Sequence, residues 1–258
     1  MVVLVVAGCG ARQDQGAPAP PGSIEGWIAR MAEAQSVRFE VDYRSEDSHS
    51  RWRTRKGEMS PLSKGSWQVG TPKPVTRMVE RRPAYRGDAV LETVMIERFS
   101  REYYAQDTRM TLPQGKSWVK LNISTNAMWA QDLEQAAYHT LNDLHPGSFL
   151  TGVDRHSLVI SPGVNETVDG TPTWRYALTA SANVESNPNA AHGKPVEVTV
   201  WVNHNGLPVR AERRATSASG HRNTTLTKLS DWDTTPAVQV PPDSEVTAPE
   251  TATWKDQW

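Results

Sequence analysis

The folded part of the chain begins with a helical pattern that is followed by a strand pattern. Ser23 is a favourable helix N-cap residue, and the apolar residues behind it recur every three or four positions until Ser36. These apolar residues are Ile24, Trp27, Ile28, Met31 and Ala34. From residue 37 to 43 apolar and charged residues alternate, which is typical of a strand with one buried face. The pattern therefore predicts one helix and then one half-buried strand.

Residues 44 to 125 carry no helical stripe, and Gly and Pro interrupt this part at short intervals. We interpret Pro61, Gly65 and Gly87, among others, as turn positions. The alternating segments between the interruptions predict strands at 51–58, 66–69, 76–82, 90–99, 102–106 and 117–121. Short strands at this spacing are typical of a β-meander.

A second helical stripe follows, and the rest of the chain returns to strands. Asn126 is a possible N-cap, Pro146-Gly147 ends the helix, and the stripe contains Met128, Trp129, Leu133, Ala136, Ala137, Leu141 and Leu144. Asp169-Gly170 and Asn205-Gly206 are hairpin turn signals. The remaining predictions are a loop at 182–195 and strands at 156–160, 173–180, 196–202, 209–215 and 224–229. We therefore expect a single α+β domain over residues 23–247, with a flexible tail at 248–258.

The N-terminus resembles the end of a bacterial export signal. An apolar run from Met1 ends in Val6-Ala7-Gly8-Cys9, and a Pro-rich stretch follows up to residue 22. This is similar to the lipobox, in which the cysteine becomes acylated. Leu is usual where Val6 stands, and the short run lacks a basic start, so we expect the true start to lie upstream. Residues 1–22 are then a signal remnant, lipobox and tether; the alternative is a buried N-terminal strand.

Composition narrows the function. The 28 Lys and Arg residues against 29 Asp and Glu give a net charge of -1, which argues against a nucleic-acid partner. Cys9 is the only cysteine, so neither an internal disulfide nor a thiolate zinc site is expected. No nucleophile elbow, phosphate loop, dinucleotide fingerprint or HExxH motif is present. We therefore expect a protein without metal or cofactor that binds rather than catalyses.

Four segments in order resemble motifs of actinobacterial lipoproteins of the LppX/LprG and LolA-like type. The segments are Tyr103 to Leu121, Val168 to Tyr176, Val200 to Arg210, and Leu229 to Val246. The resemblance covers residues 23 to 247. Asn203 departs from the common Asp, and Asp233 stands where Gly is frequent.

The resemblance implies a strongly curved antiparallel sheet, like half a barrel, with two main helices on its concave face. In that family the apolar space between sheet and helices holds acyl chains. The corresponding ligand-binding candidates here are Trp27, Met31, Phe39, Met128, Trp129 and Leu133. Our leading hypothesis is a lipoprotein anchored through Cys9 on the outer face of the cell membrane, which binds a lipid or acyl chain and meets other envelope proteins.

Two alternatives stay open at this point. The first is a non-enzymatic envelope sensor or interaction module, whose cavity is filled by its own side chains. The second is a carbohydrate-binding or hydrolytic envelope protein that uses Asp231, Asp233 and some of the 10 tryptophans.

Overall fold

In a computed structural model of the chain, the described residues are 23–45, 61–68, 75–84, 87–96, 102–122, 153–182, 194–216 and 220–254. The regular elements are α1 (Ile24–Glu33), β1 (Ser36–Ser45), β2 (Pro61–Gln68), β3 (Val75–Ala84), β4 (Gly87–Ile96), β5 (Glu102–Asp107), β6 (Met110–Thr111), β7 (Trp118–Asn122), η2 (Arg155–Ser157), β8 (Val159–Ile160), β9 (Val164–Val168), β10 (Thr171–Ser181), β11 (Pro195–Asn203), β12 (Pro208–Thr216), β13 (Arg222–Ser230), η3 (Asp243–Glu245), β14 (Val246–Thr247), η4 (Pro249–Thr251) and β15 (Thr253–Trp254).

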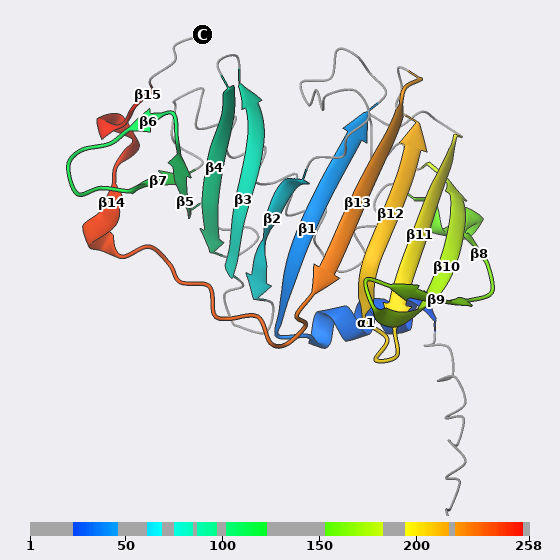
Figure 1. Cartoon of the computed structure of the whole chain (residues 1–258). Helices are drawn as coiled ribbons and strands as arrows, with labels where there is room; N and C mark the ends of the chain where they lie inside the picture. The colour runs from blue at the N-terminus through cyan, green and yellow to red at the C-terminus, as the bar shows by residue number, and fades with distance from the viewer. Residues whose placement is uncertain are drawn as a thin grey trace, which may run out of the picture.

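One large curved sheet dominates the molecule (Figure 1). Its 13 strands include the path β14-β7-β5-β4-β3-β2-β1-β13-β12-β11-β10-β8, and β9 pairs with the same strand, β10, as β8 does. Neighbours are antiparallel except β14, which runs parallel to β7. The two ends of the path do not pair, so the sheet stays unclosed. The predicted curved antiparallel sheet is confirmed at this level.

The helix α1 packs on one face of the sheet, which we call the core face. The Oγ of Ser23 accepts a hydrogen bond from the backbone N–H of Gly26 at 3.3 Å, so the predicted N-cap is confirmed. The buried residues of α1 are Ile24, Trp27 and Met31, and its apolar stripe gives it one buried side. The opposite face of the sheet, called the outer face here, carries charged side chains such as Arg38 and Glu40.

Strand register places one row of core-face residues across six neighbouring strands. The pairs that form it are Phe39↔Gly65, Gly65↔Met78, Met78↔Thr93, Thr93↔Ala105 and Ala105↔Val119. All of these except Gly65 are buried. The apolar face therefore continues far beyond the strand that follows α1.

Three predicted boundaries are wrong, and the contacts explain why. Pro61 and Gly65 lie inside β2 rather than in turns, and Gly87 opens β4. At Gly65 an added Cβ would overlap the backbone carbonyl of Arg77, so the close approach of β2 and β3 needs glycine within the strand. Proline is tolerated at the first position of a strand, where Pro61 stands.

The predicted strand 156–160 is shorter than expected. The side chain of Asp154 accepts a hydrogen bond from the backbone N–H of His156 at 3.0 Å, and the Oγ of Ser157 donates to the Asp154 carbonyl at 2.9 Å. These local bonds compete with a sheet ladder. They form the turn η2, and only Val159–Ile160 remain as a strand.

Several predictions fall on residues outside the described ranges. They include the second helix at 126–145, the strand at 51–58 and most of the loop at 182–195. Residues 23–254, as far as they are described, therefore contain a single α-helix, although the sequence predicted two main helices. In the predicted tail, η4 is followed by β15, which pairs with β6 through Thr253↔Thr111 and Trp254↔Met110.

The C-terminal crossing segment, residues 231–247, runs from the end of β13 past the ends of β1, β2 and β3 to β14 (Figure 1). Val238 and Val246 of this segment pack on a small outer-face cluster of Val94, Tyr104 and Trp118. Ser117 donates its backbone N–H to the Glu245 carbonyl at 2.9 Å. The segment therefore holds together two parts of the sheet that lie far apart.

None of the described helices has the length and hydrophobicity that crossing a membrane requires.

Candidate functional site

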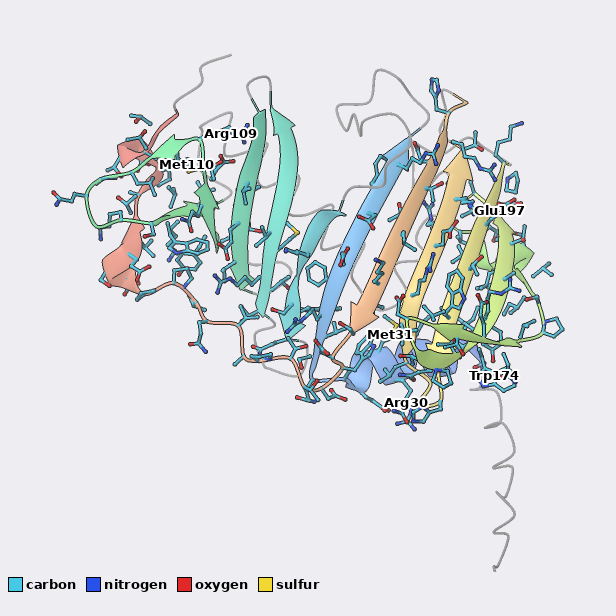
Figure 2. The ribbon with its side chains drawn as sticks, in the orientation of Figure 1. Arg30, Met31, Arg109, Met110, Trp174 and Glu197 are labelled. Carbon is cyan, nitrogen blue, oxygen red and sulfur yellow. The ribbon has the colours of Figure 1, made fainter. Side chains whose placement is uncertain are left out.

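The three described ligand-binding candidates lie together in the main core cluster. Trp27, Met31 and Phe39 are only 2%, 3% and 2% exposed. Figure 2 shows Met31 directed toward the sheet, whereas Arg30, its neighbour on α1, points away from it. The structure therefore brings these three residues together on the core face. Met128, Trp129, Leu133 and Cys9 lie outside the described residues.

Trp27 connects α1 to the far end of the sheet. Its ring lies 4.6 Å from the ring of Tyr176 on β10, measured between centroids, with the planes tilted by 50°. Burial raises the pKa of the Tyr176 hydroxyl. The indole Nε1 of Trp27 is buried and has no hydrogen-bond partner. A buried donor without an acceptor costs about 1–3 kcal/mol. The indole N–H of Trp27 is therefore a polar group that could donate a hydrogen bond within an otherwise apolar site.

The row that starts at Phe39 has small side chains in the part beyond α1. Gly65, Thr93 and Ala105 have small side chains. The next row of core-face residues, two positions further along each strand, includes the larger side chains of Trp67, Tyr103 and Leu121. Met78, between Gly65 and Thr93, is 2% exposed, and the Phe39 ring lies against Gly65, so larger side chains stand among the small ones in this row. The row belongs to the same core cluster as Trp27, Met31 and Phe39, and the motif analysis did not single it out.

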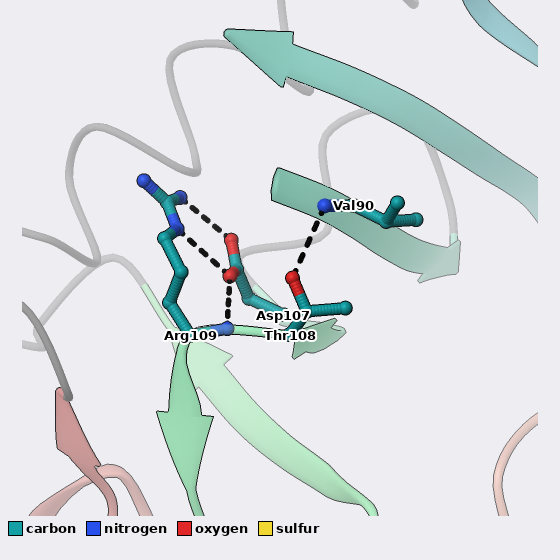
Figure 3. A network of polar contacts seen from close by, with 4 residues as sticks. All are labelled: Val90, Asp107, Thr108 and Arg109. Carbon is teal, nitrogen blue, oxygen red and sulfur yellow. Dashed lines mark hydrogen bonds and ion pairs between the residues drawn. The ribbon is translucent and has the colours of Figure 1, made fainter. Parts of the chain in front are cut away.

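A charged turn connects β5 to β6 (Figure 3). The carboxylate of Asp107 is fully buried and accepts hydrogen bonds from Nε and Nη2 of Arg109, at 2.9 and 2.7 Å. It also accepts the backbone N–H of Arg109 at 2.8 Å. The Oγ1 of Thr108 accepts the backbone N–H of Val90 at 3.2 Å, which joins the turn to β4. The network fixes the turn between β5 and β6.

Replacing Asp107 by alanine is expected to lower the free energy of unfolding by about 1.5–3 kcal/mol, the range for hydrogen bonds to charged groups. The loss stays in this range because the Arg109 side chain is 21% exposed and can turn toward water. Urea unfolding followed by circular dichroism measures the effect. Asp107→Asn keeps an acceptor and should cost less. An Asp107→Ala variant as stable as the parent protein would contradict the structural role of this turn.

The outer face carries an open groove of about 1120 Å³ between the sheet and the C-terminal crossing segment. Arg38, Lys64 and Arg77 line it from β1, β2 and β3, and residues 231–239 line its other side. Sequence reasoning missed this groove. Its charged residues alternate along separate strands, so only the strand order brings them together.

The carboxylates considered for hydrolysis each have a contact of their own. Oδ2 of Asp231 pairs with Nε of Arg38 at 3.1 Å. Oδ1 of Asp233 accepts the backbone N–H of Gln35 at 2.6 Å, and Asp233 has a φ of 62°. Asp231 has a φ of 52°, so both residues lie in the left-handed region, where glycine is usual. Both aspartates thus lie in the chain reversal after β13. Asp233 is the residue that stands where Gly is frequent in the similar lipoproteins.

Asp42 is a buried carboxyl on the outer face of β1. It is 6% exposed, and its Oδ1 has no hydrogen-bond partner. Burial raises the pKa of the Asp42 carboxyl, and the Glu40 carboxylate raises it further, whereas the Lys228 ammonium lowers it. The folded protein therefore binds the Asp42 proton more tightly than the unfolded chain does.

This raised pKa predicts how stability depends on pH. The contribution of protonated Asp42 is fully present below the unfolded-state pKa of about 3.9 and is lost as the pH rises through the raised folded-state pKa. Asp42→Asn should therefore be more stable than the parent protein at pH 7, with the difference shrinking as the pH falls toward about 4. Urea unfolding across this range measures it. Asp243→Asn, at an exposed position, is the control. A pH-independent difference would contradict the assignment.

No group of three His, Cys, Asp or Glu side chains in the described part of the chain is arranged to hold a metal ion.

Two solved structures are similar to this chain at low sequence identity. No family model and no curated protein sequence matches the chain. The Mycobacterium tuberculosis lipoprotein LppX is a structural neighbour at 15% identity and a TM-score of 0.48, over 84% of this chain and 96% of that one. The Pseudomonas aeruginosa MucA/MucB complex is another, at 14% identity and a TM-score of 0.26, over 90% of this chain and 62% of that one. The resemblance to the LppX type that the motifs predicted is confirmed.

Proposed function

We propose that this chain is an envelope lipoprotein, held on the outer face of the cell membrane through Cys9, that binds a lipid or acyl chain against the core face of its sheet. The anchor is supported by the sequence Val6-Ala7-Gly8-Cys9 and by the Pro-rich stretch behind it. The proposal includes no catalytic step, no metal and no cofactor.

The extent of the apolar core face is the observation that carries the ligand proposal. A helix of 10 residues such as α1 is about 15 Å long, which matches about three strand spacings. The path of the sheet contains many more strands than that. Leu91, Ala105 and Leu121 are 0% exposed and lie on strands beyond the reach of α1. This half of the face is apolar and shielded from water, which is the environment that an acyl chain requires.

Burial of apolar surface would drive the binding, at about 25 cal/mol per Å² of ligand surface removed from water. An acyl chain would lie against Thr93 and Ala105, beside Tyr103 and Leu121. A polar end group would meet the few polar atoms on this face. The Oγ of Ser63 is one of them, because it is buried without a partner.

The test is to purify the full chain with Cys9→Ser, extract it with organic solvent and measure copurified lipid by mass spectrometry. Ala105→Leu should reduce the lipid per protein about fivefold or more, because overpacking costs about 1–3 kcal/mol and 1.4 kcal/mol is a factor of ten. Ala211→Leu makes the same change at a buried position of β12 and should leave the lipid content unchanged. Thermal unfolding shows whether both variants fold.

Full burial of Trp27, Met31 and Phe39 favours a second candidate function, a non-enzymatic envelope sensor or interaction module with a filled interior. In that case no lipid copurifies with the parent protein, and Ala105→Leu changes only its stability. Equal lipid content in the parent, Ala105→Leu and Ala211→Leu proteins would count against acyl binding around Ala105.

A further inference from the structure

Three of the four large hydrophobic side chains that are exposed in the described part of the chain lie within six residues of one another. Val159 is 68% exposed, Ile160 is 45% exposed and Val164 is 50% exposed; the fourth, Val240, is 39% exposed. The three belong to β8 and β9, which both pair with β10. They lie at one end of the sheet, which we call the β8–β9 edge: Val159 and Val164 are on the outer side, opposite Thr179 and Arg175, and Ile160 is on the core side, opposite Leu178.

This edge is free of charge along the chain. No residue from Ser157 to Asn165 is charged, in a protein whose residues are 22% charged. The first acidic residue beyond it, Glu166, pairs with Arg175 at 2.8 Å and also accepts the Nε1–H of Trp201 at 3.2 Å. The edge therefore presents aliphatic side chains next to an acid that is paired with an arginine.

The position of the edge relates it to the membrane anchor. The ring of Tyr176 contacts the ring of Trp27, which lies near the start of α1. The same ring lies against Gly163, because a Cβ added to Gly163 would be 2.8 Å from it. The beginning of α1 thus lies beside the β8–β9 edge (Figure 1). Only 13 residues lie between Cys9 and Ser23, and the 14 steps from one to the other span at most about 50 Å when fully extended. An anchor at Cys9 would hold this end of the domain at the membrane.

We propose that the β8–β9 edge is a membrane-contact surface, in which Val159, Ile160 and Val164 insert into the headgroup boundary of the bilayer. The inference rests on the proposed anchoring at Cys9. The tether supplies a high local concentration, so a small apolar contact is enough to orient the domain. Orientation then decides which end of the core face approaches the lipid.

A lipid surface fits this edge better than an added protein strand does. Strand addition needs a run of unpaired backbone N–H and C=O groups. Here β8 contains only two residues. Residues 161–163 connect it to β9, and one of them is Pro162, which has no backbone N–H. Such interruptions protect sheet edges from pairing. Exposed aliphatic side chains without a usable strand ladder match a bilayer rather than a second sheet.

The experiment places an environment-sensitive dye at single cysteines. The mature chain from residue 9 onward carries Cys9→Ser and an N-terminal hexahistidine tag, which holds it on phosphatidylcholine–phosphatidylglycerol vesicles that contain nickel-chelating lipid. A dye at Val164→Cys or Ile160→Cys should shift its emission to shorter wavelength and be quenched by a lipid-borne quencher. The matched control is Val240→Cys, at the fourth exposed hydrophobic position, where neither change is expected.

A second measurement uses no label. At a content of nickel-chelating lipid that retains only part of the tagged parent protein, the combined variant Val159→Ser, Ile160→Ser and Val164→Ser should sediment with the vesicles about tenfold less than the parent, because it loses the aliphatic surface that the bilayer would bury. Thermal unfolding confirms that the variant is folded.

Equal dye responses at residues 164 and 240, or equal sedimentation of parent and variant, would overturn the membrane contact. So would a dimer in solution that Val164→Ser dissociates, because the edge would then serve a second copy of the chain. The tag replaces the natural anchor and copurified lipid is measured separately. A failure here therefore leaves the acyl-chain proposal standing, and a failure of acyl binding leaves the dye result standing.

Discussion

Replacing Gly65 by alanine is expected to lower the free energy of unfolding by about 3 kcal/mol, at the upper end of the usual cost of overpacking. A Cβ at this position would overlap the backbone carbonyl of Arg77 on β3 and would lie 2.8 Å from Cζ of Phe39. The Phe39 ring can turn, but the carbonyl belongs to the ladder between β2 and β3. The methyl group therefore forces two strands apart. Urea unfolding monitored by tryptophan fluorescence measures the loss.

Gly26 provides the matched control for this substitution. It lies in the first turn of α1, where an added Cβ would meet only Oγ of Ser23, at 3.9 Å. Gly26→Ala should therefore stabilise the protein by about 0.5–1 kcal/mol, because alanine restricts the unfolded chain and favours the helix. Opposite signs at the two glycines are the expected result. A neutral Gly65→Ala variant would show that β2 does not approach β3 as closely as described.

The second large effect is expected at Trp27. Replacing this residue by alanine should cost about 3–5 kcal/mol, the range for removing a buried aromatic side chain. Trp27 is 2% exposed, and its ring contact with Tyr176 connects α1 to β10. A domain of this kind has about 5–15 kcal/mol of stability in total. Thermal and urea unfolding of Trp27→Ala should therefore show a large loss, and near-parental stability would contradict the packing of α1 on the sheet.

A comparison of two tryptophans separates packing from hydrogen bonding. Trp27→Phe loses volume but no hydrogen bond, since the Nε1 of Trp27 has no partner. Trp201→Phe loses the hydrogen bond that Nε1 of Trp201 donates to Glu166. It also changes the cation–π contact in which Cζ of Arg210 lies 4.7 Å from the centroid of the Trp201 ring. Both residues are buried. The Trp201 variant should be the less stable by about 1 kcal/mol. Equal losses would show that Trp27 donates a hydrogen bond in solution.

Local sequence patterns predicted those parts of the fold that local physics determines. Alternation from Val37 to Tyr43 predicted β1, and helical spacing behind Ser23 predicted α1; both are confirmed. The hairpin signal at Asp169-Gly170 is also confirmed, with φ values of 49° and 80° between β9 and β10. Each of these features depends on a few neighbouring residues, so the sequence carries the whole signal.

Features that depend on distant contacts were not predictable in the same way. Gly65 indicates a turn when it is considered alone, and only the neighbouring carbonyl of Arg77 explains its place within a strand. The positive φ at Asp233 follows from its contact with Gln35, 198 residues earlier. The groove beside Arg38 and Lys64 exists because the C-terminal crossing segment returns past those strands.

The candidate site shows the same division. Trp27, Met31 and Phe39 were predicted to share one face, and they do, because each falls on the apolar side of its own element. The row of core-face residues through Thr93 and Ala105 was not predicted, since it depends on the register of several strand pairs. The exposed edge at Val159 was likewise not apparent from composition. Apolar residues in a strand are normally assigned to the core.

The pairing of β1 with β13 has a consequence for biogenesis. Arg38 lies opposite Ser230, so the middle of the sheet joins residues almost 200 positions apart. The first strand therefore lacks one of its two neighbours, β13, until nearly all of the polypeptide has been synthesised, whereas β2 follows it closely in the chain. Such long-range pairing makes folding slow. One edge of the strand that carries Val37, Phe39 and Val41 therefore stays unpaired until β13 has been made.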